Sequence, residues 1–201
     1  MNIGHCFGED TQILVDLGDG KGPHDAIIKN LVNSKFKVLN ENGEWIDATA
    51  KYCGQKETFK MTMNHNNLKH HLEVLVTENQ VWPTEDWVYQ NGKWIGDGVK
   101  KDKTIKDIWT SHQGFLSAVI YENLFGKNKN PDNVTPKFDK VLYIGMQNSN
   151  MVSKQIEIFI KKHNLVDTYC IELYKPGYFA LGNSWMYGVM SGIMTAGCNE
   201  I

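Results

Sequence analysis

CFGEDTQILV, residues 6–15, is the stretch from which the fold of this chain is best predicted. A cysteine and a short polar turn come first, and an alternating run follows in which Thr11, Ile13 and Val15 fall on one face. A period of two residues is typical of a strand with two distinct faces. The pattern therefore predicts a strand that begins just after Cys6 and holds its thiol in a fixed position.

A second stretch, LEVLVTENQVWPT at residues 72–84, is followed by DWV at 86–88 and GDGV at 96–99. Together with residues 6–15 these motifs resemble the Hint family, the domains of inteins, bacterial intein-like proteins and hedgehog autoprocessing proteins. In that family a nucleophile strand, a turn with a short helix, a hairpin ending in Thr-x-x-His and a Gly-Asp turn follow one another. The same order here implies a flat, horseshoe-shaped β fold.

Composition narrows the class of protein and its partners. The chain has 201 residues with 21 basic and 23 acidic side chains, and every basic one is lysine. Lysine lacks the planar fork with which arginine binds phosphate and guanine, so no nucleic-acid partner is expected. No apolar run approaches about 20 residues and the N-terminus lacks the apolar core of a signal peptide. We therefore expect no membrane partner and a cytoplasmic protein, or a virion protein if its role is structural.

The cysteines show no CxxC pair, which argues against a zinc site built on cysteine. Free thiols are expected, because a chain of this length without an export signal does not need disulfides. We interpret Cys53 as a core residue, and His65, His70 and His71 as solvated rather than metal-binding. No metal and no cofactor is predicted. The four cysteines are Cys6, Cys53, Cys170 and Cys198.

The predicted fold class is mainly β, a Hint-type horseshoe of short strands with an inserted α/β subdomain. Residues 1–5 form a flanking arm, 6–100 the N-terminal part of the β-domain, 101–165 the insert, and 166–201 the C-terminal part with an apolar tail. Apolar spacing predicts helices over 25–33, 104–125 and 151–163 and a strand over 139–145. Residues 166–173 and 177–183 are expected to pair as a closing hairpin.

The C-terminal region resembles an intein terminus, in which a His-Asn pair precedes a Cys, Ser or Thr. In that alignment Ala196 and Gly197 occupy the His-Asn positions and Cys198 is the residue just after the module. Cys170 falls in the family's Tyr-[Asp/Cys]-Ile-Glu motif, at a position that tunes the thiols. An alternative register ends the homologous part at Asn183 and leaves the apolar residues 185–195 as an extra element.

The resemblance implies a self-processing reaction at Cys6, and one replaced residue implies that this reaction is impaired. Cys6 would attack the carbonyl of His5 and replace an amide by a thioester. The family's Thr-x-x-His histidine protonates the departing nitrogen, a role worth about 10²–10⁴-fold. Here Thr77 is present but Gln80 replaces the histidine, and glutamine cannot deliver a proton near neutral pH. The first step should be slow or absent.

The later steps are also affected. Cys198 would capture the acyl group if it folds beside Cys6. Release then needs an asparagine side chain that cyclises onto its own peptide bond, and Gly197 has none. The prediction is an intein-like autoprocessing domain that is impaired in full splicing and acts on its own flanking polypeptide, in a single turnover if it is active.

Two alternatives remain open at the level of the sequence. A non-catalytic Hint-fold module, for example in a phage particle or mobile element, would fit the short arm before Cys6. Its apolar residues 185–195 would then be buried in a homo-oligomer or against an assembly partner. A Cys–His hydrolase that acts on other molecules would need a histidine beside Cys6, and the sequence indicates none.

Overall fold

The computed structural model describes residues 5–64, 72–105, 107–108, 138–147, 150–182 and 193–198. The chain in these ranges is mainly β, and a 10-stranded sheet with the order β3-β2-β4-β5-β6-β1-β10-β9-β7-β8 carries most of it. The elements are β1 (Phe7–Gly8), β2 (Gln12–Asp16), β3 (His24–Ile27), the 3-10 helix η1 (Ile28–Leu31), β4 (Phe36–Leu39), β5 (Trp45–Asn64), β6 (Leu72–Val76), β7 (Val81–Gln90), β8 (Lys93–Thr104), β9 (Phe138–Gln147), β10 (Asn150–Leu173), β11 (Tyr178–Ala180) and β12 (Met194–Ala196).

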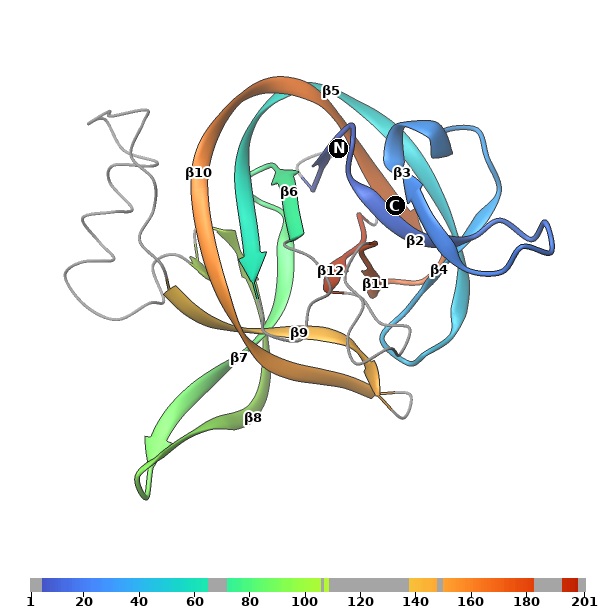
Figure 1. Ribbon diagram of the computed structural model, residues 1–201. Helices are drawn as coiled ribbons and strands as arrows, with labels where there is room; N and C mark the ends of the chain where they lie inside the picture. The colour runs from blue at the N-terminus through green and yellow to red at the C-terminus, as the bar shows by residue number, and fades with distance from the viewer. Residues whose placement is uncertain are drawn as a thin grey trace.

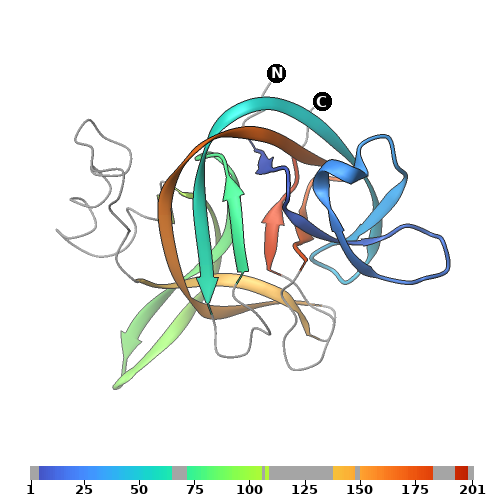
Figure 2. The same ribbon diagram turned by 45° about the horizontal axis from the view of Figure 1, so that its top comes forward.

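The two longest strands form the frame of the molecule. β5 and β10 pair antiparallel from Asn64 and Glu157 at one end to Ala48 and Leu173 at the other. Figure 1 shows them as one curved band that arches over the small β11–β12 sheet, while the β7–β8 hairpin projects away from the body. The same arch is seen in Figure 2, with β1 and β6 below it. The band brings the N-terminal and C-terminal segments to its concave side.

Two irregularities in the β5–β10 pairing let the band bend. The register shifts once between His163 and Leu165, and again between Thr168 and Tyr169. At the second shift Thr168 lies opposite Gly54 and Tyr169 opposite Tyr52, so Cys53 is an extra residue in β5. An extra residue on one strand increases the local twist and re-aims the neighbouring side chains.

The core lies on both faces of β2, as the alternation of residues 11–15 predicts. Ile13 and Val15 join the main core, whereas Leu14 packs in a second cluster with Tyr178 and Met194. All of these side chains are buried. The predicted strand after Cys6 is therefore confirmed, and it is covered on its two sides.

Two predicted helices differ in the structure: the first is the end of a strand and a short 3-10 helix, and the second is a strand. Residues 25–33 form the end of β3 and then η1, because Ile13 and Leu14 of β2 pair with Ala26 and Asp25. Residues 151–163 belong to β10, where Ile158 and Ile160 alternate inward with a period of two. Backbone pairing with β5 and β9 along this stretch outweighs the local helical spacing.

Other expectations have mixed outcomes. The strand over 139–145 is confirmed within β9. The closing hairpin is wrong in its pairing, since β11 pairs with β12 and not with β10. Most of the helix predicted over 104–125 lies outside the described residues, and Thr104 is the last residue of β8. The domain boundaries at residues 5/6, 100/101 and 165/166 stay predictions.

Candidate functional site

The backbone of Cys6 is held by the threonine of the TENQ stretch. Thr77 follows β6 directly, and β6 pairs with β1 through Val76 and Phe7. The amide nitrogen of Cys6 donates a hydrogen bond to Thr77 Oγ1 at 3.1 Å, and Thr77 N donates to the Cys6 carbonyl at 3.0 Å. The threonine hydroxyl therefore lies on the nitrogen of the His5–Cys6 peptide bond.

A tight turn orients this hydroxyl. Gln80 N donates to the Thr77 carbonyl at 3.2 Å, and Thr77 Oγ1 donates to Asn79 Oδ1 at 2.9 Å. The hydroxyl can accept from Cys6 N because its own proton points to Asn79. Sequence reasoning did not single out Asn79, although an asparagine two residues after a turn threonine is a usable signal.

The side chain of Gln80 is directed to the C-terminal strand β12. It is fully buried, and its Nε2 donates to Thr195 Oγ1 at 2.8 Å and to the Ala196 carbonyl at 2.9 Å. Its Oε1 is buried and accepts no hydrogen bond within the described part of the chain. Gln80 thus links the N-terminal half to the last strand.

The C-terminal residues are fixed beside β10 and β11. Gly197 N donates to the Gly177 carbonyl at 3.0 Å, and Cys198 N donates to the Ile171 carbonyl at 2.7 Å. Cys198 is buried, and Figure 1 shows the two ends of the chain near each other. Cys198 lies in the same buried cluster of side chains as Cys6.

All four cysteines meet in one place. Cys6, Cys170 and Cys198 form a buried cluster, and the partly buried Cys53 packs against it. They are free thiols that come from the start of the chain, β5, β10 and the segment after β12. The interpretation of Cys53 as a core residue holds in part, because it packs against this buried cluster but is itself partly exposed. The extra residue in β5 turns it to the cluster, and nothing in the local sequence reveals that register shift.

Interactions among the cysteine side chains shift their pKa values in opposite directions. Bonds donated by Cys170 and Cys6 lower the pKa of Cys53 to about 3, and the nearby Lys56 adds to this effect. The bond to Cys53 and burial raise the pKa of Cys6. Bonds to Cys198 and Cys53, together with burial, raise the pKa of Cys170. Cys53 Sγ also donates a hydrogen bond to the Lys51 carbonyl at 3.6 Å.

A cavity of about 320 Å³ opens beside Cys6, with Lys56, Thr77 and Asn79 in its lining. Lys56 Nζ lies 3.9 Å from Cys6 Sγ. Lys56 and Thr77, which both contact Cys6, therefore also line this cavity.

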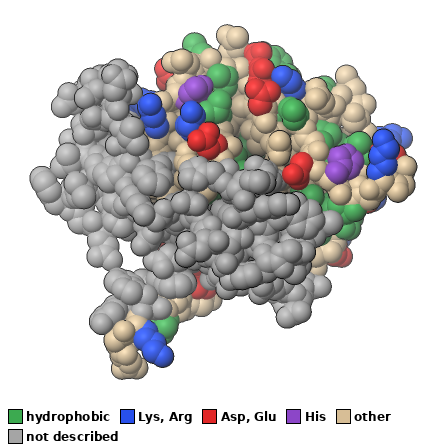
Figure 3. Space-filling view, in the orientation of Figure 1, with side chains coloured by type: hydrophobic (Ala, Val, Ile, Leu, Met, Phe, Trp, Pro, Cys, Tyr) green, Lys and Arg blue, Asp and Glu red, His purple; other side chains and the backbone are tan. Residues whose placement is uncertain are grey.

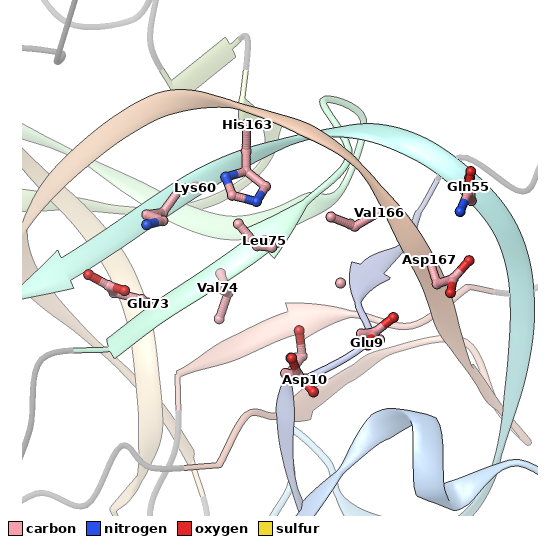
Figure 4. A pocket seen from close by; sticks show the side chains of 12 residues that line it. Glu9, Asp10, Gln55, Lys60, Glu73, Val74, Leu75, His163, Val166 and Asp167 are labelled. Carbon is pink, nitrogen blue, oxygen red and sulfur yellow. The ribbon is translucent and has the colours of Figure 1, made fainter. Parts of the chain in front are cut away.

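A larger cavity of about 550 Å³ lies among the turn after β1, β6 and β10. Figure 4 shows Lys60 and His163 on one side of it and acidic side chains, including Glu73 and Asp167, around the rest. Its lining mixes both signs of charge with apolar residues. It has no feature that the chemistry of Cys6 uses.

The remaining surface carries no strong signal. On the face in Figure 3, lysine and acidic side chains of the described residues are interspersed. Across the described ranges, no set of histidine, cysteine and carboxylate groups is arranged to hold a metal ion. A membrane-spanning helix is also absent from the ranges that the structure describes.

The resemblance found in the sequence can be compared with known proteins at this point. No family model matches the chain, and no curated protein matches it. Among solved structures, a variant of the Ssp DnaB mini-intein superposes with a TM-score of 0.57 at 11% identity and covers 100% of both chains. The chain has the intein fold.

A DnaB intein from Synechocystis sp. PCC 6803 superposes with a TM-score of 0.52 at 12% identity, over 96% of this chain and 98% of that one. At such identities the likeness concerns the Hint-type intein fold alone. His65, His70, His71 and Asn183 lie outside the described residues, so the solvated histidines and the alternative register remain predictions.

Of the apolar residues 185–195, the structure describes 193–195. Ile193, Met194 and Thr195 are fully buried inside this chain. The described end of the segment therefore belongs to the fold itself. An oligomer or assembly contact through the rest of it stays a prediction.

Proposed function

We propose that this chain is an intein-type self-processing domain that forms a thioester at Cys6 and does not complete protein splicing. The observation that carries the proposal is the hydrogen bond from Cys6 N to Thr77 Oγ1, with Cys6 itself fully buried. This bond satisfies a buried backbone amide. It also fixes the nitrogen that an N–S acyl shift at the His5–Cys6 peptide bond would release, which supports the proposal.

The first step takes place between two adjacent residues, His5 and Cys6. Cys6 Sγ, as a thiolate, attacks the carbonyl carbon of His5 and closes a five-membered ring, and the C–N bond to Cys6 then breaks. The nitrogen leaves as an amine and takes a proton, and residues 1–5 are now held as a thioester. Because nucleophile and carbonyl belong to adjacent residues, no association entropy is lost. Thr77 keeps the nitrogen and its hydrogen in place.

The second step would transfer the acyl group from Cys6 to Cys198, and the reaction would end at that intermediate. Cys198 belongs to the same cluster of sulfurs as Cys6, which supports transfer between them. Gly197 has no side chain that can cyclise and release the C-terminal part. Gln80, in the histidine's place, donates to Thr195 and Ala196, so its role is to hold the C-terminal strand.

The substrate on this proposal is the chain's own flanking polypeptide. The test is incubation of the purified folded protein with excess dithiothreitol, and separately with hydroxylamine, followed by intact-mass measurement. Release of a peptide of residues 1–5 is expected, at a slow rate because the histidine is missing. Cys6→Ala is the control and should release none.

An unchanged mass with both nucleophiles, in protein shown to be folded by circular dichroism, would overturn the proposal. Release at the same rate from Cys6→Ala would also overturn it, because cleavage would then not pass through the thiol. Size-exclusion chromatography of the same sample tests the alternative of a structural module. A defined oligomer formed by an inert protein would support that alternative.

A further inference from the structure

Cys6 has to carry a negative charge on a buried sulfur if it is to attack the His5 carbonyl. Its side chain is 0% exposed and packs with Cys170 and Cys198. Burial disfavours the charged form of a thiol, and a buried charge is stable only beside an opposite charge or hydrogen-bond donors. The proposed reaction therefore needs a cation close to Cys6 Sγ.

Lys56 is the cation that contacts this sulfur. Its Nζ donates a hydrogen bond to Cys6 Sγ over a distance of 3.9 Å. An ammonium group has donors and no acceptor, so the sulfur is the acceptor of this bond. Because a hydrogen bond between two charged groups is stronger than one to a neutral acceptor, the contact favours the thiolate over the thiol.

The sheet brings this lysine to the start of the chain. Lys56 lies in β5, after the bulge that the extra residue Cys53 makes in that strand. β1 begins directly after Cys6 and pairs with β10, and β10 pairs in turn with β5 (Figure 1). The backbone of Lys56 is held opposite Val166 of β10. The position of its ammonium group relative to Cys6 therefore follows from strand pairing.

The groups around Cys6 act in opposite directions on its charge. The hydrogen bond to Cys53 and burial raise the pKa of Cys6, whereas the positive charge of Lys56 lowers it. Lys56 also lines the cavity of about 320 Å³ beside Cys6, which is large enough to hold water that can take up a proton. The other charged residues in that lining are Glu57, Glu78 and Lys162.

We propose that the Lys56 ammonium is the counter-ion of the Cys6 thiolate and a further catalytic residue of the acyl shift. This inference rests on the proposed function of Cys6. The Cys6 thiol gives its proton to water in the cavity, and Lys56 donates a hydrogen bond to the thiolate that forms. The thiolate attacks the carbonyl carbon of His5, the C–N bond to Cys6 breaks, and the departing nitrogen takes a proton from water. One proton leaves the sulfur and one reaches the nitrogen, so none is gained or lost overall.

The charge of Lys56 is tested first at Cys6 itself, without reference to cleavage. The folded protein is alkylated with iodoacetamide between about pH 6 and 10, and the rate at Cys6, which depends on its thiolate, is read by peptide mapping. Lys56→Met keeps the aliphatic stem and removes the charge. Its profile should be displaced to higher pH by about one unit or more, because loss of a cation within about 4–6 Å raises the pKa of a thiol.

The role in the reaction is tested by release of residues 1–5 at a dithiothreitol concentration above which the rate no longer rises, so that the acyl shift limits it. Lys56→Met should be slower by about tenfold, since about a hundredfold loss of thiolate is offset by about tenfold higher nucleophilicity of the more basic sulfur. Lys56→Arg keeps the charge and should retain most of the rate, whereas Lys56→Glu should be the slowest. Lys162→Met, in the same cavity, is the control and should stay within about twofold.

The outcomes separate the two proposals. A wild type that releases nothing overturns the proposed function, and the alkylation profiles then decide on the counter-ion alone. An active wild type whose Lys56→Met variant has the same release rate and alkylation profile overturns the role of Lys56 and leaves the function of Cys6 intact. Equal losses in Lys56→Met and Lys56→Arg also overturn that role, since the effect would then not follow the charge.

Discussion

At the scale of single residues, the site depends on one hydroxyl. Thr77 Oγ1 accepts from Cys6 N at 3.1 Å and donates to Asn79 Oδ1 at 2.9 Å. Both groups are buried or partly buried, so water replaces these bonds poorly. The geometry of the His5–Cys6 peptide bond is therefore sensitive to this side chain.

Thr77→Ala should slow thiol-induced release of residues 1–5 by about tenfold. The reason is loss of a buried hydrogen bond worth about 1–1.5 kcal/mol to the reacting amide. The measurement is the rate of release by mass spectrometry. Thr77→Ser keeps the hydroxyl and should retain most of the rate, and equal rates for the alanine and serine variants would contradict the role of the hydroxyl.

At the scale of elements, two glycines stand at positions where a side chain would be unfavourable. A Cβ on Gly197 would come within 2.4 Å of Leu173 Cγ at the end of β10. Gly54 has φ of +87° and open space around it, so only its backbone conformation restricts substitution. The first position is limited by packing, and the second by the bulge.

Gly197→Asn, the change that would restore a cyclising side chain, should destabilise the protein by about 1–3 kcal/mol through overpacking against Leu173. A double-mutant cycle with Leu173→Ala, read from urea denaturation, should show favourable coupling because the smaller residue makes room. Gly18→Asn, in an exposed turn with nothing within 4 Å, is the control. Additive effects of the two changes would contradict the predicted clash.

Gly54→Ala should lower the free energy of unfolding by about 1–2 kcal/mol, since a left-handed conformation is unfavourable for alanine. Gly20→Ala, at φ of +83° in an exposed turn, should lose a similar amount. Urea denaturation of the two variants and of the wild type measures both losses. Equal stability of Gly54→Ala and wild type would argue against the bulge.

At the scale of the whole molecule, the β5–β10 arch collects reactive groups from distant parts of the chain. Cys6 precedes β1, Cys53 lies in β5, Cys170 lies in β10 and Cys198 follows β12. The C-terminal strand is tied back by Gln80 and by the backbone bond from Cys198 to Ile171. The site exists only when these segments are assembled.

Mild oxidation with diamide should cross-link the cluster. Each disulfide forms as two thiols lose two electrons and two protons to diamide, which becomes a hydrazine. Peptide mapping without reduction should find links from residue 53 to residue 6 or 170 in monomeric protein. The Cys53→Ser variant should lack these links, and a wild type that forms only links between molecules would contradict the cluster.

Much of the fold could be predicted from local patterns. The alternation of residues 11–15 predicted the strand β2, and the apolar run within residues 139–145 predicted β9. The helix predicted over 151–163 failed because β10 gains its stability from pairing with β5 and β9, which local spacing does not report. The C-terminal hairpin failed for the same reason, since β11 pairs with a strand that follows a long intervening segment.

By itself the sequence determined that the chain is mainly β, that Thr77 follows a strand, and that Gln80 has no imidazole and Gly197 no side chain. These properties depend on side-chain chemistry and on short spacings. Only the tertiary structure decided that Cys53 joins the other cysteines and that Lys56 lies beside Cys6. The physical reason is the register of two long strands, in which one extra residue changes the direction of a side chain.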